Sequence, residues 1–561
     1  MDLRQRIERV RGRLDGLALR GLDRVRALNP SYALALLEQG SKLADERRHV
    51  EALTFFDRGL RLDSGNANAF YRRSAILKRM KRSGEALASL DQALALKPDF
   101  AEALISRAMI LRSLGEIDQA LACLRAAMKL RPEDSVLHTT YIFTLNFDPS
   151  LDEADKQRER AEWERRHALK FKSRWKPHDN EPVSGRRLRI GYVSSYFGVD
   201  NSTFSFAEVI LNHDPDRFEI FCYSDTRNED EATAILRKQV DHWRRTNDMS
   251  DDQVTELVRR DRIDILIDCL GHMKGNRLLV FAQKPAPIQV TAWGEVTGTG
   301  LQAMDYLLGS KVLVPESYRA LLRECVMDLP NFSGFWSPGP LPDVGPLPAI
   351  TQGHVTFGSF SRLAKIVEPT IRCWAAILRR IPGARLVLKH PQLAEDIYRT
   401  RIADSFRRHG VSPDALIFLG GTDRQTHFAC YNMIDIALDP FPHAGGMTTL
   451  DALWMGVPVV SWPGKTISSR WAATCLVPLG LSDFLADSEE GYVELAVAKA
   501  SDIASLATLR QTLRGRMAGS EFGDGQRFCR AVEAKYIEMW SRWRHSLDSS
   551  SHISAGGPAE I

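Results

Sequence analysis

An internal period of 34 residues restricts the fold of the first quarter of this chain more than any other feature. Ala52, Ala86 and Ala120 are 34 positions apart, so small residues recur at a constant spacing. This period is typical of tetratricopeptide helix pairs, whose helices cross closely where the residues are small. Because each pair buries its apolar face against the next pair, the pattern predicts a stacked helical superhelix. Three repeats are predicted over residues 33–134, at 33–66, 67–100 and 101–134.

The segments around the repeats differ from them in composition. Residues 1–32 are rich in arginine with interspersed acidic residues, which predicts a charged N-terminal helix. Residues 135–185 are predicted to form capping helices followed by a linker. Residues 546–561 combine Ser, Gly and Pro with few apolar residues, so we expect a disordered tail there.

Two later regions alternate apolar strand patterns with helical patterns. In residues 186–337, strands are predicted at 188–193, 217–224, 263–269, 288–292 and 306–308, and helices at 203–212, 230–239 and 250–260. In residues 352–545, strands are predicted at 355–359, 384–389, 416–419, 434–438 and 457–461. Residues 338–351 overlap a run of prolines and are predicted to be a linker. This alternation predicts two Rossmann-like domains, each with a parallel sheet.

Composition excludes several classes of protein. The 561 residues are 44% apolar and 26% charged, which is ordinary for a globular protein. A net charge of +4 is too small to indicate a nucleic-acid partner. No apolar run reaches the roughly 18 residues of a membrane span, and no signal peptide is recognised. Eight scattered cysteines without a CxxC pair predict a cytoplasmic protein with reduced thiols, and no metal-ligand spacing is present.

Residues 435–465 have the pattern of a nucleotide site. An apolar strand is followed by Gly445 and Gly446, and a helix then opens at Thr448 with Asp451 one turn inside. Glycines allow a ligand to approach the backbone closely, and a helix N-terminus favours phosphate. A carboxylate just inside that helix can accept hydrogen bonds from ribose hydroxyls. The stretch therefore predicts a nucleoside diphosphate site at the carboxyl edge of a parallel sheet.

This stretch resembles the donor-binding region of the protein O-GlcNAc transferase family. Members show the same Leu-Asp, Thr-Thr, Asp, Leu-Trp, Gly and Pro residues at the same spacing, and residues 285–289 (Pro-Ala-Pro-Ile-Gln) match a second family segment. The resemblance implies a tetratricopeptide superhelix followed by an α/β GT-B fold, in which two Rossmann-like domains face a cleft. Residues 186–337 would form the acceptor side, and residues 352–545 would bind the UDP-sugar.

The resemblance assigns roles to two more segments of the second half. Residues 357–365 resemble a family element whose lysine is essential, which makes Lys365 the cation for the leaving diphosphate. Arg362 stands where the family often has an amide. In residues 420–427, Thr422, Arg424 and His427 are expected to contact the base and phosphates. Arg424 replaces a family lysine.

Two departures from the family pattern concern the glycine-rich loop. Gly446, Met447 and Thr448 stand where members carry His-Thr-Thr, so Thr448 keeps a hydroxyl that Met447 lacks. These residues and Gly445 are still expected to contact the donor. His443 either compensates for the missing histidine or is a surface residue.

The first half supplies the possible bases. The family carries a histidine after the first strand, and Asp200 occupies about that position. Asp200 either accepts the proton of the attacking hydroxyl or only caps the next helix. His272 replaces a family tyrosine and is a second possible base that would face the acceptor. A phosphate oxygen of the donor could also act as the base that accepts this proton.

The sequence therefore predicts an inverting, metal-independent glycosyltransferase without a cofactor. The expected donor is UDP-N-acetylglucosamine or a related UDP-sugar, and the expected acceptor is a Ser or Thr hydroxyl of a polypeptide held in the repeat groove. Three alternatives remain open: fucosyl transfer from GDP-fucose, asparagine-linked glucosylation, and a repeat scaffold whose sugar site has decayed. No nucleic acid or membrane partner is expected.

Overall fold

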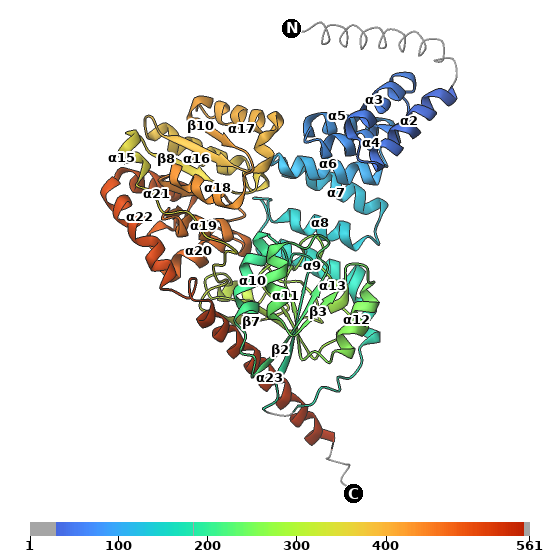
Figure 1. Ribbon diagram of the computed structural model, residues 1–561, viewed down its shortest axis with the longest axis vertical. Coiled ribbons are helices and arrows are strands. Elements are labelled where there is room, and N and C mark those ends of the chain that lie inside the picture. Colours follow the sequence, from blue (N-terminus) through green and yellow to red (C-terminus); the bar gives the residue numbers. More distant parts are fainter. Residues whose placement is uncertain (1–29, 183–184, 555–561) are drawn as a thin grey trace. The chain divides into compact units, whose positions relative to one another are not determined.

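The computed structural model describes residues 30–182 and 185–554 (Figure 1). The described chain forms two compact units. The smaller unit contains the chain up to Arg112, Gln119–Pro132 and Glu395–Ile397, and the larger unit contains Ser113–Asp118, Glu133–Ala394 and the chain from Tyr398 onward. The predicted N-terminal helix at 1–32 lies almost wholly outside the described residues.

The smaller unit is built from helix pairs. Among the described residues its helices are α2 (Pro30–Asp45), α3 (His49–Leu62), α4 (Ala67–Arg79), α5 (Ser83–Leu96), α6 (Ala101–Ser113) and α7 (Ile117–Leu130). Ala52, Ala86 and Ala120 are fully buried, as close helix crossings require. The described helices form three pairs, and the repeat bounds given for residues 33–134 stay a prediction.

A polar contact repeats with the same period as the small residues. Arg73 Nε donates to Asp57 Oδ1 at 2.7 Å, and 34 residues later Arg107 Nε donates to Asp91 Oδ1 at 2.7 Å. Each arginine joins the first helix of one repeat to the second helix of the repeat before it. The ladder fixes how neighbouring pairs stack, because a guanidinium holds a carboxylate in a defined direction.

The first α/β half of the larger unit contains a parallel sheet of seven strands in the order β3-β2-β1-β4-β5-β6-β7. These are β1 (Leu188–Ser194), β2 (Phe218–Ser224), β3 (His242–Arg245), β4 (Ile265–Asp268), β5 (Ile288–Thr291), β6 (Tyr306–Gly309) and β7 (Cys325–Asp328). The helices are α10 (Asn201–Leu211), α11 (Glu231–Gln239), α12 (Asp251–Arg260), α13 (Leu278–Phe281) and α14 (Glu316–Arg319). The five predicted strands and three predicted helices are confirmed. The sequence reading missed β3 and β7, the two edge strands, because they are short and only partly buried.

The second α/β half contains a parallel sheet of five strands in the order β10-β9-β8-β11-β12. These are β8 (Thr356–Ser359), β9 (Arg385–Lys389), β10 (Leu416–Leu419), β11 (Ile436–Leu438) and β12 (Val459–Val460), all of which were predicted. The helices are α15 (Pro348–Gln352), α16 (Glu368–Arg380), α17 (Asp396–Arg408), α18 (Arg424–Ala429), α19 (Met447–Trp454), α20 (Trp471–Leu476), α21 (Glu489–Ser501) and α22 (Ile503–Ala518). The predicted linker at 338–351 ends earlier than expected, since α15 begins at Pro348.

The last helix, α23 (Gly525–Ser554), packs on the first half although it follows the second half in sequence (Figure 1). Its Phe528, Val532 and Tyr536 are fully buried in the same apolar cluster as the residues of β1 and α10. The helix continues to Ser554, so the prediction of a disordered tail from 546 was wrong for residues 546–554. No described helix is both long enough and apolar enough to cross a bilayer.

Helices α8 (Ser135–Leu145) and α9 (Glu153–Trp163) were predicted to cap the repeats, but they belong to the larger unit. Glu153 Oε2 accepts the N–H of Ile467 at 2.8 Å in the second half, and Gln157 Nε2 donates to the carbonyl of Thr297 at 2.6 Å in the first half. Glu153, Lys156, Gln157 and Arg160 of this charged helix are buried, and Glu153 and Gln157 bond to loops of the two halves.

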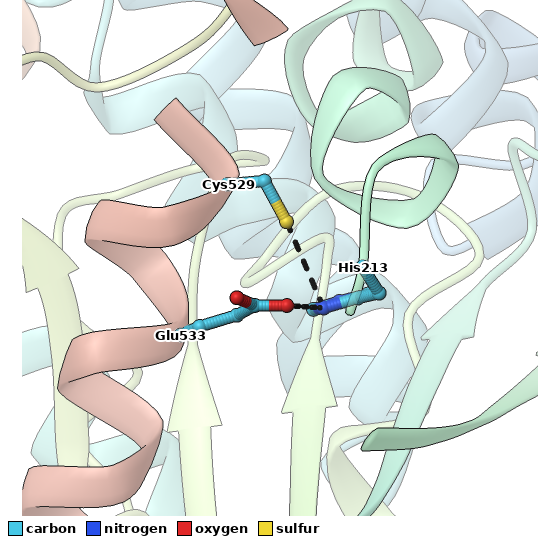
Figure 2. Close-up of side chains that lie close together, drawn as sticks. All are labelled: His213, Cys529 and Glu533. Atoms are coloured by element: carbon cyan, nitrogen blue, oxygen red, sulfur yellow. Dashed lines mark hydrogen bonds and ion pairs between the residues drawn. The ribbon is translucent and has the colours of Figure 1, made fainter. Parts of the chain in front are cut away.

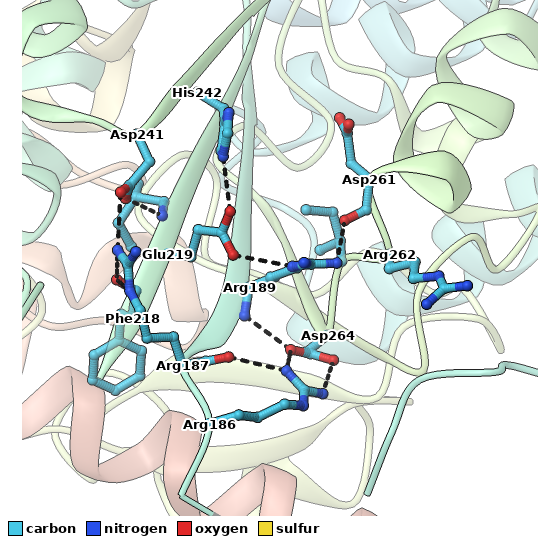
Figure 3. A network of polar contacts seen from close by, with 12 residues as sticks. Arg186, Arg187, Arg189, Phe218, Glu219, Asp241, His242, Asp261, Arg262 and Asp264 are labelled. Carbon is cyan, nitrogen blue, oxygen red and sulfur yellow. Dashed lines mark hydrogen bonds and ion pairs between the residues drawn. The ribbon is translucent and has the colours of Figure 1, made fainter. Parts of the chain in front are cut away.

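A polar network holds the chain where it enters the first sheet (Figure 3). The buried carboxylate of Asp264 accepts two hydrogen bonds of 2.7 Å from the guanidinium of Arg186. It also accepts the N–H of Arg189 at 2.9 Å and the amide of Asn180 at 2.8 Å. One carboxylate thus joins the entering segment to the first residues of β1.

We expect the Asp264→Ala substitution to lower the free energy of unfolding by on the order of 3 kcal/mol, since it leaves the partly buried Arg186 without its partner. Thermal and urea unfolding measure this loss. Glu316→Gln is the control, because its carboxylate is 91% exposed and its ion pair contributes about 0.5 kcal/mol or less. Equal stability of the two variants would contradict this reading.

Candidate active site

A cleft of about 600 Å³ is lined by residues of both α/β halves. It lies at the carboxyl ends of the strands, where open parallel sheets bind their ligands. Nine of the residues predicted from sequence line this cleft: Asp200, Arg362, Lys365, Thr422, Arg424, His427, Gly446, Met447 and Thr448. Segments more than 200 residues apart in sequence are thus brought together at one site.

Lys365 ends a short 3-10 turn that follows β8. Its Nζ donates to the carbonyl of Ala444 at 2.6 Å, so the ammonium lies against the glycine-rich loop. Burial, together with the positive charge of Arg362, lowers the pKa of Lys365, while Asp439 favours its charged form. A buried cation in this position has a strong field in the cleft, because little water screens it.

Asp439, at the end of β11, organises the glycine-rich loop. One carboxylate oxygen accepts the N–H of Gly445 at 2.6 Å, and the other accepts the hydroxyl of Ser461 at 2.7 Å. A Cβ on residue 445 would lie 2.6 Å from Thr448 Oγ1 and 3.1 Å from Asp439 Oδ1. Glycine is required at 445 because the loop folds tightly over this carboxylate, so Gly445 shapes the cleft from behind and does not line it.

The loop then leads into the start of α19. In the part of the chain that the structure describes, the N–H groups of Met447 and Thr448 have no hydrogen-bond partner. Both residues line the cleft. Free N–H groups at a helix start favour an anion. This arrangement fits the predicted diphosphate position next to Lys365.

Another part of the cleft lining combines cations with aromatic rings. The guanidinium of Arg424 lies 4.0 Å from the ring centroid of Phe204 in α10. Lys389 Nζ donates to the hydroxyl of Thr422 at 2.9 Å, and the ring of His427 lies edge-on to Phe360. Flat, partly charged surfaces of this kind suit a nucleobase.

The sequence reading missed Lys389 and His390, which also line the cleft. Both stand at the end of β9, so the rule that ligands bind beyond the carboxyl ends of parallel strands could have found them. Burial and the neighbouring cations lower the pKa of His390 to about 4. The ring is therefore neutral near pH 7 and can accept or donate a hydrogen bond.

Asp200 lines the cleft and also caps α10. Its Oδ1 accepts the N–H of Ser202 at 2.8 Å, so the capping alternative from the sequence describes a real contact. A second cavity, of about 850 Å³, shares Asp200 and Val199 with the cleft and extends along the first half. The residue therefore stands where the two cavities meet.

His272 and Asp451 do not line the cleft. His272 is fully buried, and its Nε2 lies 2.9 Å from the carbonyl oxygen of Thr299. Burial lowers its pKa to about 3, so the ring stays neutral. The structure thus does not bring His272 to face an acceptor. Asp451 is buried inside α19, where burial raises its pKa to about 7.

His213, Cys529 and Glu533 form the group of potential metal ligands found among the described residues (Figure 2). His213 Nδ1 lies 2.9 Å from Glu533 Oε1 and 3.7 Å from Cys529 Sγ. The thiol also donates to the carbonyl of Val209 at 3.3 Å, and His213 Nε2 lies 2.7 Å from the hydroxyl of Tyr192. These mutual contacts fasten α23 to the first half, away from the residues that line the cleft.

Two parallel α/β halves around a cleft, with a buried lysine against a glycine-rich helix start, define a nucleotide-sugar glycosyltransferase of the GT-B class. Residues 153–332 and 348–532 match the model of glycosyl transferase family 41, and residues 16–67 and 77–140 match tetratricopeptide repeat models. The first match covers more than half of the 561 residues. The chain belongs to glycosyl transferase family 41.

Similar proteins agree with this assignment. A probable UDP-N-acetylglucosamine–peptide N-acetylglucosaminyltransferase SPINDLY of Solanum lycopersicum is 34% identical over 394 residues, which are 68% of this chain and 42% of the relative. The SEC protein of Arabidopsis thaliana is 30% identical over 64% of this chain and 37% of its own length. The chain thus spans about two-fifths of the length of these curated relatives.

A solved structure is similar over nearly its whole length. A lysine-to-methionine mutant of the Thermobaculum terrenum O-GlcNAc transferase superposes with a TM-score of 0.83 at 31% identity. The match covers 92% of this chain and 99% of that chain. The predicted fold, a tetratricopeptide array followed by two Rossmann-like halves, is confirmed.

We expect the Gly445→Ala substitution to weaken binding of UDP by about tenfold or more, because the new methyl group displaces Thr448 and Asp439. Calorimetric titration measures this change. The control is Gly515→Ala in α22, where a Cβ meets nothing within 4 Å, and which should leave UDP binding unchanged. Unchanged binding in both variants would overturn the role given to the loop.

Proposed function

We propose that the protein is an inverting glycosyltransferase that transfers N-acetylglucosamine from a UDP-sugar to Ser or Thr hydroxyls of a polypeptide. The observation that carries this proposal is the contact of Lys365 Nζ with Ala444 in the glycine-rich loop, 2.6 Å long and inside the cleft. The SPINDLY and SEC relatives, both named as probable UDP-N-acetylglucosamine–peptide N-acetylglucosaminyltransferases, support the donor and the peptide acceptor.

In this mechanism the acceptor oxygen attacks the anomeric carbon from the face opposite the diphosphate. The bond between that carbon and the diphosphate oxygen breaks, and UDP leaves with the electron pair. Lys365 and the free N–H groups of Met447 and Thr448 stabilise the charge that builds on the diphosphate. No metal ion and no cofactor enters the proposed reaction.

The hydroxyl proton needs an acceptor, and Asp200 is the proposed one. Its Oδ1 caps α10, while among the described contacts its other oxygen has no hydrogen-bond partner. Asp200 stands where the donor cleft meets the second cavity, so it can reach a hydroxyl delivered from that side. The second cavity is the proposed place for the acceptor segment.

The Lys365→Met substitution should weaken UDP binding by roughly 30-fold and abolish transfer, since a buried charge-assisted hydrogen bond to phosphate is lost. Calorimetric titration of UDP and GDP, followed by a transfer assay with UDP-N-acetylglucosamine, tests this. Lys311→Met is the control on the surface of the first half. Binding of GDP in preference to UDP would move the proposal to GDP-fucose, and binding of neither would favour a decayed site.

The repeats are proposed to recruit the acceptor polypeptide, as helical arrays commonly do. Removal of residues 1–100 leaves α6, α7 and the whole larger unit in place. We expect this truncation to lower glycosylation of protein acceptors by about tenfold or more while UDP affinity stays unchanged. Undiminished transfer to protein by the truncated enzyme would overturn the recruiting role.

The proposal includes a cytoplasmic location. All eight cysteines lie in the described part of the chain and are free, and seven of them are at least partly buried. Free thiols of this kind are usual in a reducing compartment.

A further inference from the structure

A second buried lysine lies behind the glycine-rich loop, on a helix that belongs to neither Rossmann-like half. Lys156, in α9, is 1% exposed. Its Nζ donates to the hydroxyl of Ser468 at 3.4 Å, and among the described residues this is its one hydrogen-bond partner. A buried ammonium carries three hydrogen-bond donors. This lysine therefore has N–H donors for which the described residues supply no acceptor.

Ser468 is the residue that connects Lys156 to the cleft. It lines the cleft, and its carbonyl accepts the N–H of Ala444 at 3.0 Å. The carbonyl of the same Ala444 accepts the ammonium of Lys365. Ser468 and Lys365 therefore hold the N–H and the carbonyl of the same residue, Ala444, which places Ser468 close to Lys365 at the glycine-rich loop.

The hydroxyl of Ser468 is set up as a donor toward the cleft. Its oxygen lies 3.1 Å from Thr466 Oγ1 and accepts from Lys156. Thr466 Oγ1 also accepts the N–H of Ser469, and either hydroxyl of the Thr466–Ser468 pair can donate to the other. When Thr466 donates, both lone pairs of the Ser468 oxygen are occupied, and the Ser468 hydrogen can point into the cleft.

The carboxylates near Lys156 are engaged elsewhere. The carboxylate of Glu153 accepts hydrogen bonds from the backbone N–H of Ile467 and from the side-chain amide of Gln157. The carboxylate of Asp148 accepts hydrogen bonds from the backbone N–H and the hydroxyl of Ser150. None of these carboxylates lies within ion-pair distance of Lys156 among the described residues.

The positive charge of Lys156 reaches the glycine-rich loop. Glu295 attracts the ammonium from the first half, but its Oε1 is bonded to Arg160, which itself repels Lys156. Burial lowers the pKa of Lys156 to about 8, and the positive charge of Lys156 also helps to lower the pKa of His443 across the loop. Glu153, Glu295 and Asp148 favour the charged form of Lys156, but with one long hydrogen bond the ammonium keeps unused donors, and its charge can act on a diphosphate in the cleft through Ser468.

We propose that Lys156 and Ser468 form a further anion-binding subsite for the leaving diphosphate of the donor. The subsite rests on the proposed function, because it takes the nucleoside diphosphate to be the occupant of the cleft. Ser468 contacts the phosphate through its hydroxyl, and Lys156 acts through Ser468 as a positioning residue. The cleft thereby receives a cation from α9, outside both halves.

The test compares UDP with UMP, which keeps the base, the ribose and one phosphate. Binding of each to wild type, Ser468→Ala and Lys156→Met is measured by calorimetric titration. We expect both substitutions to reduce UDP affinity by about tenfold and to change UMP affinity by about twofold or less. The double variant should resemble Lys156→Met alone, because the two residues act in series.

Each result decides between a ligand-binding and a structural role. Equal losses for UDP and UMP, or unchanged affinity for both in Ser468→Ala, would overturn the subsite while leaving the proposed function in place. Wild type that binds neither UDP nor GDP would overturn the proposed function, and the subsite with it. If wild type prefers GDP, the comparison of GDP with GMP takes the place of UDP with UMP. Thermal unfolding of each variant shows whether Lys156→Met folds. If Lys156→Met does not fold, Ser468→Ala decides the test, because this substitution removes only a single oxygen atom.

Discussion

The buried pair of opposite charges at the glycine-rich loop, Asp439 and Lys365, is the constraint on which the rest of the site depends. Asp439 ties the loop to β11 and β12 through Gly445 and Ser461. Burial raises the pKa of Asp439 and lowers that of Lys365, while each favours the charged form of the other. Because neither charge is stable alone in the interior, the loop, the helix start and the lysine form one electrostatic unit.

A helix outside both Rossmann-like halves, α9, is hydrogen-bonded to both of them. Arg160 of α9 donates to Glu295 and Thr297 in the first half, and Glu153 of the same helix accepts from Ile467 in the second half. Phe147, just before α9, stacks on His443 at a centroid distance of 5.1 Å. The family match that begins at residue 153 is consistent with this, since α9 is structurally part of the catalytic unit.

The strands and the donor loop could be predicted because their signals are local. A buried parallel strand reads as an apolar run, and β1, β5 and β11 were found in that way. The half-exposed edge strands β3 and β7 carry no such run and were missed. Lys365 was recognised from the family motif, whereas Lys389 has no motif of its own and is brought to the cleft only by the order of the strands in the sheet.

The sequence by itself determined the repeat period, the two alternating α/β halves and the glycine-rich loop, because each depends on contacts between residues close in the chain. Only the tertiary structure decided that His272 is buried against Thr299 and Trp163, away from the cleft. It also decided that Lys156 lies behind Ser468, 312 residues further along the chain. Burial and long-range pairing set the charge and direction of a side chain, and neither is encoded in the spacing of its neighbours in sequence.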